Sequence, residues 1–70
     1  MNGWREIERD KNGFATKRCL DEMFNSLPIL IYADSEYDHY SVVEYCNASD
    51  YRGDIELHTQ YIKWKPIINP

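Results

Sequence analysis

Two cysteines and two histidines are the residues of this chain best suited to chemistry. Cys19, Cys46, His39 and His58 could in principle supply the sulfur and nitrogen ligands of a zinc site. Structural zinc sites usually draw such ligands from closely spaced pairs. The sequence contains no C-x-x-C and no H-x-x-x-H pair. We therefore expect two ordinary, buried or half-buried thiols, with no metal site and no cofactor.

A catalytic cysteine would need a histidine as base and a carboxylate to orient that histidine. Cys46 could meet His39 or His58 across neighbouring strands, and Asp34 or Asp38 could orient the imidazole. However, a chain of 70 residues has little interior left for a water-excluding pocket once its core is filled. No glycine-rich phosphate-binding motif occurs either. We expect a protein that is not an enzyme.

Acidic and tyrosine residues gather in two segments. The first acidic segment, residues 32–40, reads YADSEYDHY, and the second, residues 49–54, reads SDYRGD. If the two converge, they form an anionic surface on which tyrosine supplies contact area and acid steers a basic protein partner. Two solvated turns are the alternative. The candidate partner-binding residues are Asp34, Glu36, Tyr37, Asp38, Tyr40, Asp50, Tyr51 and Asp54.

The two tryptophans define an alternative site. Trp4 and Trp64 could stack a nucleotide or another small ligand, as in a sponge or a sensor. The stretch YIKWKP also interleaves aromatic and basic residues, but the net charge of −4 disfavours binding to phosphate backbones. In the structural interpretation, Trp64 alternates toward a core and Pro66 ends its strand or marks a sheet edge.

One helix has clear local signals. Four apolar residues fall at helical spacing, namely Leu20, Met23, Phe24 and Leu27. Thr16 is suited to cap the N-terminus, and Pro28 ends the helix, so we expect it over about residues 15–26. Before it, DKNG predicts a tight turn, because Asn-Gly readily adopts positive φ.

The remaining pattern predicts strands. PILIYAD and YSVVEYC read as a hairpin, WREIE as a short strand, and DIELHTQ with YIKWKPI as one bent strand or two. We expect one α+β domain over residues 1–70, a three- to four-stranded antiparallel sheet with the helix packed on one face. The expected core is Trp4, Leu20, Met23, Phe24, Leu27, Ile29, Ile31, Val43, Ile55, Leu57, Ile62 and Trp64.

Composition narrows the class of protein. Hydrophobic residues make up 43% of the chain and aromatic residues 14%, which is typical of a folded domain. The acidic balance disfavours attraction to nucleic acid or to anionic lipid. No signal peptide and no long apolar run is apparent, so we expect a cytoplasmic protein with no membrane partner. Exposed strand edges in so short a chain would also allow a homodimer.

Three stretches carry a resemblance. WREIE near the start, LPILIY in the middle and YIKWKPI near the end resemble short phage and prophage proteins of a domain-of-unknown-function family. That family typically ends in a His-Trp-x-Pro-Leu-Pro-like element, and Lys63 stands where it commonly has histidine. The resemblance implies a phage or mobile-element origin, and hence the cytoplasm of a bacterial host. With the acidic segments, it suggests an anti-defence inhibitor that covers the nucleic-acid channel of a defence nuclease.

Overall fold

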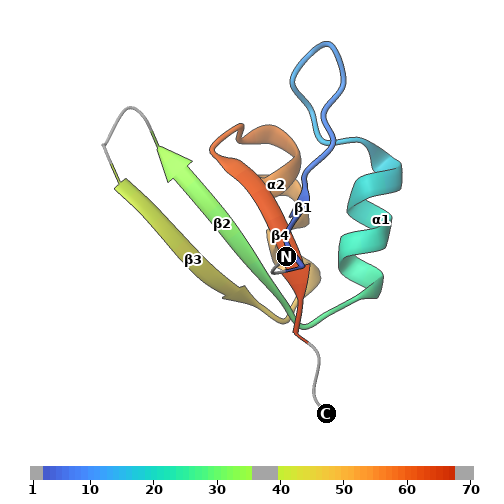
Figure 1. Cartoon of the computed structure of the whole chain (residues 1–70). Helices are drawn as coiled ribbons and strands as arrows, with labels where there is room; N and C mark the ends of the chain where they lie inside the picture. Colours follow the sequence, from blue (N-terminus) through green and yellow to red (C-terminus); the bar gives the residue numbers. More distant parts are fainter. Residues whose placement is uncertain (1–2, 36–39, 68–70) are drawn as a thin grey trace.

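The computed structural model describes residues 3–35 and 40–67 (Figure 1). One four-stranded antiparallel sheet, in the order β1-β4-β2-β3, is accompanied by two short helices, which confirms the expected α+β fold. Of the candidate site residues, Glu36, Tyr37 and Asp38 lie outside the described residues, as does the side chain of Tyr40. In chain order the elements are β1 (Arg5–Glu6), α1 (Lys17–Asn25), β2 (Ile29–Ser35), β3 (Tyr40–Cys46), the 3-10 turn η1 (Ser49–Tyr51), α2 (Arg52–Leu57) and β4 (Tyr61–Pro66).

The topology consists of two interleaved β-α-β units. Strands β1 and β2 are joined through α1, and β4 lies between them in the sheet. Strands β3 and β4 are joined through α2, and β2 lies between them. Each unit therefore contributes the strand that completes the other. The closing stretch YIKWKP forms a central strand, so its role in the fold is to hold the two units together.

Helix α1 follows the sequence prediction closely. The backbone N–H of Cys19 donates to the Thr16 hydroxyl oxygen at 3.2 Å, which confirms the predicted N-cap. At the other end the Ser26 N–H donates to the Met23 carbonyl. Leu20 and Met23 are buried by the helix, and its bounds lie within two residues of the expected ones.

Helix α2 is a correction, because DIELHTQ was expected to be extended. Its first half is helical instead, and of its apolar pair only Ile55 is buried, while the Leu57 side chain is 59% exposed. The short helix is held by the Arg9 guanidinium, which donates to the carbonyls of Ile55, Glu56 and His58. These contacts span more than forty positions of sequence, so no local pattern reports them.

An irregularity in β4 explains another error. Tyr32 pairs with Lys63 but the next residue, Ala33, pairs with Tyr61, so Ile62 is an extra residue in β4. Because strand side chains alternate, Tyr61 and Trp64 can both face the core only if such a residue intervenes. Ile62 is consequently 40% exposed, although alternation had placed it in the core.

The core lies between the helices and one face of the sheet. The prediction of core residues is wrong for Val43, Leu57 and Ile62, which are exposed. Three other expected core residues, Trp4, Phe24 and Leu27, are only partly buried. Val43 is exposed because it lies on the face of an edge strand that no helix covers. The confirmed core residues are Leu20, Met23, Ile29, Ile31, Ile55 and Trp64, and the core residues that the sequence did not reveal are Ile7, Ala15, Ala33, Cys46 and Tyr61.

Candidate functional site

The two acidic segments flank strand β3: the first ends at Tyr40, where the strand starts, and the second follows Cys46, where it ends. Asp34 pairs with Ser41 at the hairpin end, while Cys46, which leads into the second segment, pairs with Ile29 at the far end (Figure 1). Five strand positions separate these two pairs, which is roughly 17 Å along the sheet. Asp50 and the residues after it continue from that far end. One copy therefore holds Asp34 far from the end of β3 that leads to Asp50, whereas Asp54 lies on α2, which returns the chain toward β4. Convergence of the two segments stays a prediction, because Glu36, Tyr37 and Asp38 lie outside the described residues.

Most of the cationic side chains are engaged by the chain itself. Six of the eight Lys and Arg residues have an ion pair, a set of carbonyl acceptors or an aromatic ring as partner: Arg5, Arg9, Lys17, Arg52, Lys63 and Lys65. The other two, Lys11 and Arg18, are exposed. Within the described part of the chain, Asp34, Asp50 and Asp54 form no ion pair. Asp50 and Asp54 are exposed, so their charges face solvent, and Asp34 is partly exposed.

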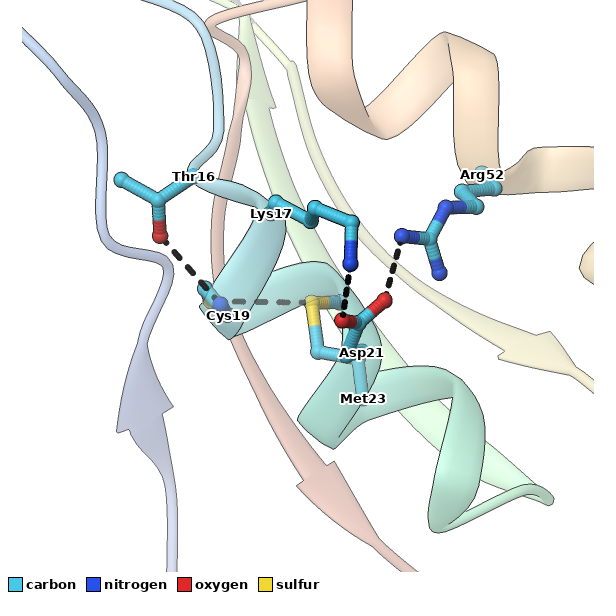
Figure 2. A network of polar contacts seen from close by, with 6 residues as sticks. All are labelled: Thr16, Lys17, Cys19, Asp21, Met23 and Arg52. Atoms are coloured by element: carbon cyan, nitrogen blue, oxygen red, sulfur yellow. Dashed lines mark hydrogen bonds and ion pairs between the residues drawn. The ribbon is translucent and has the colours of Figure 1, made fainter.

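Asp21 joins the second acidic segment to helix α1. Arg52 lies within that segment, and its guanidinium donates to one Asp21 carboxylate oxygen at 2.6 Å, while Lys17 donates to the other at 3.1 Å (Figure 2). These hydrogen bonds, that of Arg52 first, lower the pKa of the Asp21 carboxyl below its ordinary value. The Arg52 guanidinium also lies 5.8 Å from the centre of the Phe24 ring. Because the guanidinium of Arg52 contacts Asp21 and Phe24 on α1, it does not neutralise the acidic residues of its own segment.

Arg9 makes the densest set of polar contacts in the described chain. Its guanidinium donates five hydrogen bonds, all to backbone carbonyls: those of Gly13, Ile55, Glu56, His58 and Tyr61, at 2.7 to 3.1 Å. Burial lowers the pKa of Arg9, since desolvation disfavours the charged form. No carboxylate is among its acceptors. Arg9 fastens the N-terminal turn, the end of α2 and the start of β4 together, and its role is structural.

The cysteines and histidines do not assemble a reactive site among the described residues. Cys46 is 1% exposed and its thiol donates to the Ala48 carbonyl at 3.3 Å. Cys19 is half-buried, and its thiol contacts the Met23 sulfur at 4.0 Å (Figure 2). His58 is exposed at the C-terminus of α2, and His39 lies outside the described residues. Residues 3–35 and 40–67 contain no group of three His, Cys, Asp or Glu placed to hold a metal ion.

The two tryptophans lie on opposite faces of the sheet. Trp64 faces the helices and is 1% exposed, and the Arg5 guanidinium lies 5.2 Å from its ring centre. Trp4 is half-buried and packs edge-on against Tyr32, with ring centres 6.4 Å apart. Tyr32 neighbours the buried Ile31 on the same strand and so points the other way. The sheet therefore separates the pair that the ligand-stacking alternative requires.

The face of the sheet turned away from the helices, here called the open face, carries aromatic and lysine side chains. The Lys63 ammonium lies 4.9 Å from the Tyr32 ring centre and 5.6 Å from that of Trp4, and the Lys65 ammonium lies 5.2 Å from Trp4. Such contacts let the lysine stems cover ring surface while the ammonium groups stay wet. On β3 the same face carries Tyr45, which is 59% exposed. Alternation in YIKWKP puts the two lysines on one side, but their aromatic partners lie elsewhere in the chain, Tyr32 on β2 and Trp4 just before β1.

Two hollows on the described surface are open to solvent. One, of about 120 Å³, lies between β1 and α1 and is lined by residues that include Arg5, Glu8 and Cys19. Another, of about 310 Å³, is lined by residues that include Arg9 and Ile62. Arg5 in the first hollow is engaged by Glu22 and Arg9 in the second by carbonyls, whereas Arg18, which also lines the first, is exposed.

No family model, no curated protein and no solved structure matches this chain. The resemblance to short phage proteins therefore stays a prediction that rests on the three sequence stretches alone. Within residues 3–35 and 40–67, neither helix has the length and apolar composition needed to cross a membrane.

Proposed function

We propose that this chain is a small, non-enzymatic binding protein that acts through its acidic, tyrosine-bearing surface on a protein with a basic surface. The observation that carries the proposal is the unequal use of charge. Six of the eight cationic side chains have partners within the chain, whereas Asp34, Asp50 and Asp54 have no ion-pair partner in its described part.

The mechanism is electrostatic steering followed by occlusion. Net charge of −4, with the negative groups solvent-facing, accelerates encounter with a basic surface and weakens encounter with nucleic acid. Tyr51, 40% exposed beside Asp50, supplies contact area at little cost in side-chain entropy. The partner class that fits best is a nucleic-acid-binding protein of bacterial defence, such as a nuclease, whose basic channel would be covered.

The test begins with affinity capture from cells of a bacterial host and continues with association kinetics against the captured protein. The variant Asp34→Asn/Asp50→Asn should slow association about tenfold at low salt and flatten its salt dependence, since steering weakens with the charge that produces it. The matched control is Glu6→Gln/Glu56→Gln, which changes net charge equally at exposed positions outside the two acidic segments.

Equal effects of the two double variants would mean that net charge alone matters and that the acidic segments are not the contact. An association rate that is the same for wild type and both double variants, and that does not change with salt, would contradict the electrostatic mechanism altogether.

A further inference from the structure

The two edges of the sheet differ in how they are protected. Strand β1 is two residues long, Arg5 and Glu6, and both are charged, which are common ways of blunting an edge. Strand β3 forms the other edge with seven residues, YSVVEYC, and Figure 1 shows no element beyond it. It contains no proline and no lysine, and its pairing with β2 runs without a bulge from Ile29↔Cys46 to Ser35↔Tyr40. Half of its backbone groups face outward and are available for another strand.

Apolar side chains are exposed on both faces of β3. Val42, on the side of the helices, is 38% exposed, and Val43 and Tyr45, on the open face, are 49% and 59% exposed. An edge strand that met only water would need apolar residues on its covered face alone. Exposure on both faces favours a neighbour that continues the sheet over one that caps a single face.

We propose that the neighbour is a second copy of this chain, with β3 paired antiparallel to β3 of the partner across a two-fold axis at Val43. The axis stands perpendicular to the sheet, so the result is one eight-stranded sheet with all four helices on the same face. In this register Val43 meets the partner's Val43, Ser41 meets the partner's Tyr45, and Val42 meets the partner's Glu44. Such a two-fold contact uses the same residues twice and closes on itself.

The charge pattern of β3 favours a copy over a basic partner and selects this register. Glu44 is the only charged residue among the seven, so the strand offers little to a basic surface. A shift of the axis by one residue toward Glu44 would place the two Glu44 side chains directly opposite each other, which is destabilising. A shift by one residue the other way would pair Tyr45 with a position beyond the start of β3. Only the register centred on Val43 pairs all seven residues without opposing like charges.

The dimer also changes the geometry of the acidic segments. Antiparallel pairing lays the Tyr40 end of one β3 beside the Cys46 end of the other. Asp34 of one protomer then approaches the end that leads to Asp50 of its partner, although one copy holds these two ends far apart. This consequence rests on the proposed function, since it matters only if the acids bind a partner; the dimer itself does not depend on it.

The first experiment is sedimentation equilibrium of the full chain. A contact of two seven-residue strands is smaller than the standard interface of about 800 Å² per partner, so dissociation on the order of micromolar is expected. Val43→Lys brings two ammonium groups together at the axis and should weaken the dimer about tenfold or more. The matched control Leu57→Lys introduces the same charge at a 59% exposed position on α2 and should leave association unchanged. Far-ultraviolet circular dichroism of both variants checks that the fold is retained.

The second experiment tests the register by disulfide formation. An equimolar mixture of Ser41→Cys and Tyr45→Cys chains should give a cross-linked heterodimer, because these positions face each other at about 5 Å between Cα atoms. Ser41→Cys alone should not cross-link, since its two copies lie about 13 Å apart along the strands. Wild type controls for Cys19 and Cys46.

The outcomes separate the two proposals. A monomer at all accessible concentrations, or cross-linking that is equal for Ser41→Cys alone and for the mixture, overturns the dimer and leaves the β3 edge to a strand from another protein. The dependence on salt adds a further distinction. Two chains of charge −4 repel each other, so screening by salt should strengthen the dimer. Binding to a basic partner is attractive, so the same screening should weaken it. A salt-strengthened dimer without any basic partner would refute the proposed function alone.

Discussion

Replacement of Arg9 by methionine should destabilise the whole domain. The methionine keeps an apolar stem of similar length but removes all five hydrogen bonds to carbonyls. Three of the lost acceptors, the carbonyls of Ile55, Glu56 and His58, lie at the end of α2. The carbonyls of Glu56 and His58 also accept the N–H groups of Ala15 and Tyr61, but none of the three has a further helical turn to bind it. The loss therefore falls on a helix too short to be stable by itself.

The magnitude follows from the number and kind of bonds. A hydrogen bond to a charged group contributes about 1.5–3 kcal/mol, but five bonds from one guanidinium share its desolvation and are not additive, so we expect about 3 kcal/mol in total. A domain of this length has a free energy of unfolding of about 4–10 kcal/mol. The variant should thus lose a large part of its stability. Arg9→Lys should recover little, because one ammonium cannot reach acceptors spread over three elements.

The assay is urea unfolding at 25 °C, followed by the fluorescence of the buried Trp64. Arg18→Met is the matched control, since Arg18 is exposed on α1 and the same atoms are removed. Arg18→Met should stay within about 0.5 kcal/mol of wild type. If Arg9→Met also stays within that range, the contacts of Arg9 do not stabilise the fold and the structural role assigned to it is wrong.

Three further changes follow from the same structure. Asp21 has a lowered pKa, so its contribution to stability is complete above its unfolded pKa of about 3.9 and is lost as pH falls through the lower folded value. Between pH 5 and pH 2 the free energy of unfolding should therefore fall less steeply for Asp21→Asn than for wild type. The same pH dependence in both proteins would contradict the ion pairs of Asp21. Trp64→Ala should lower the free energy of unfolding by about 3–5 kcal/mol, because Trp64 is buried, and Leu57→Ala by under 0.5 kcal/mol, because Leu57 is exposed. Similar losses in denaturant unfolding would mean that the assignment of the core is wrong. Thr16→Ala should cost about 1 kcal/mol and Thr16→Ser much less, because serine keeps the capping oxygen; equal losses would argue against the cap.

Elements with complete local signals were predictable from the sequence. Helix α1 has its cap, its apolar stripe and its terminator within one short stretch, and the turn before it has Gly13 at φ 87° as Asn-Gly implied. Helix α2 has no such signals. Its alternating Ile55 and Leu57 mimic a strand, and the groups that stabilise it belong to Arg9, far away along the chain. Local sequence patterns therefore do not predict that contact, because Arg9 and Ile55 are 46 positions apart.

The candidate site was only partly readable for the same reason. The sequence shows where the acidic residues are, but only the structure shows which cations pair with them. Arg52 lies among the acidic residues of the second segment, yet its guanidinium pairs with Asp21 on α1. Likewise, YSVVEYC was recognised as a strand, but whether it was central or at an edge depended on where β4 inserts. Which face of β3 the helices cover was not evident from the sequence either, so Val43, an expected core residue, is exposed on the open face.

The position of β4 connects the fold to the surface left for function. By entering between β1 and β2, the last strand excludes any other chain from the middle of the sheet, and its Trp64 fills the space beneath the helices. The bulge at Ile62 adds Tyr61 to the same core. What remains outside includes the long edge β3, the acids near its two ends and the open face with its aromatic and lysine side chains. The proposed pairing of two such edges would cover the exposed valines of β3 and set acids from its two ends side by side.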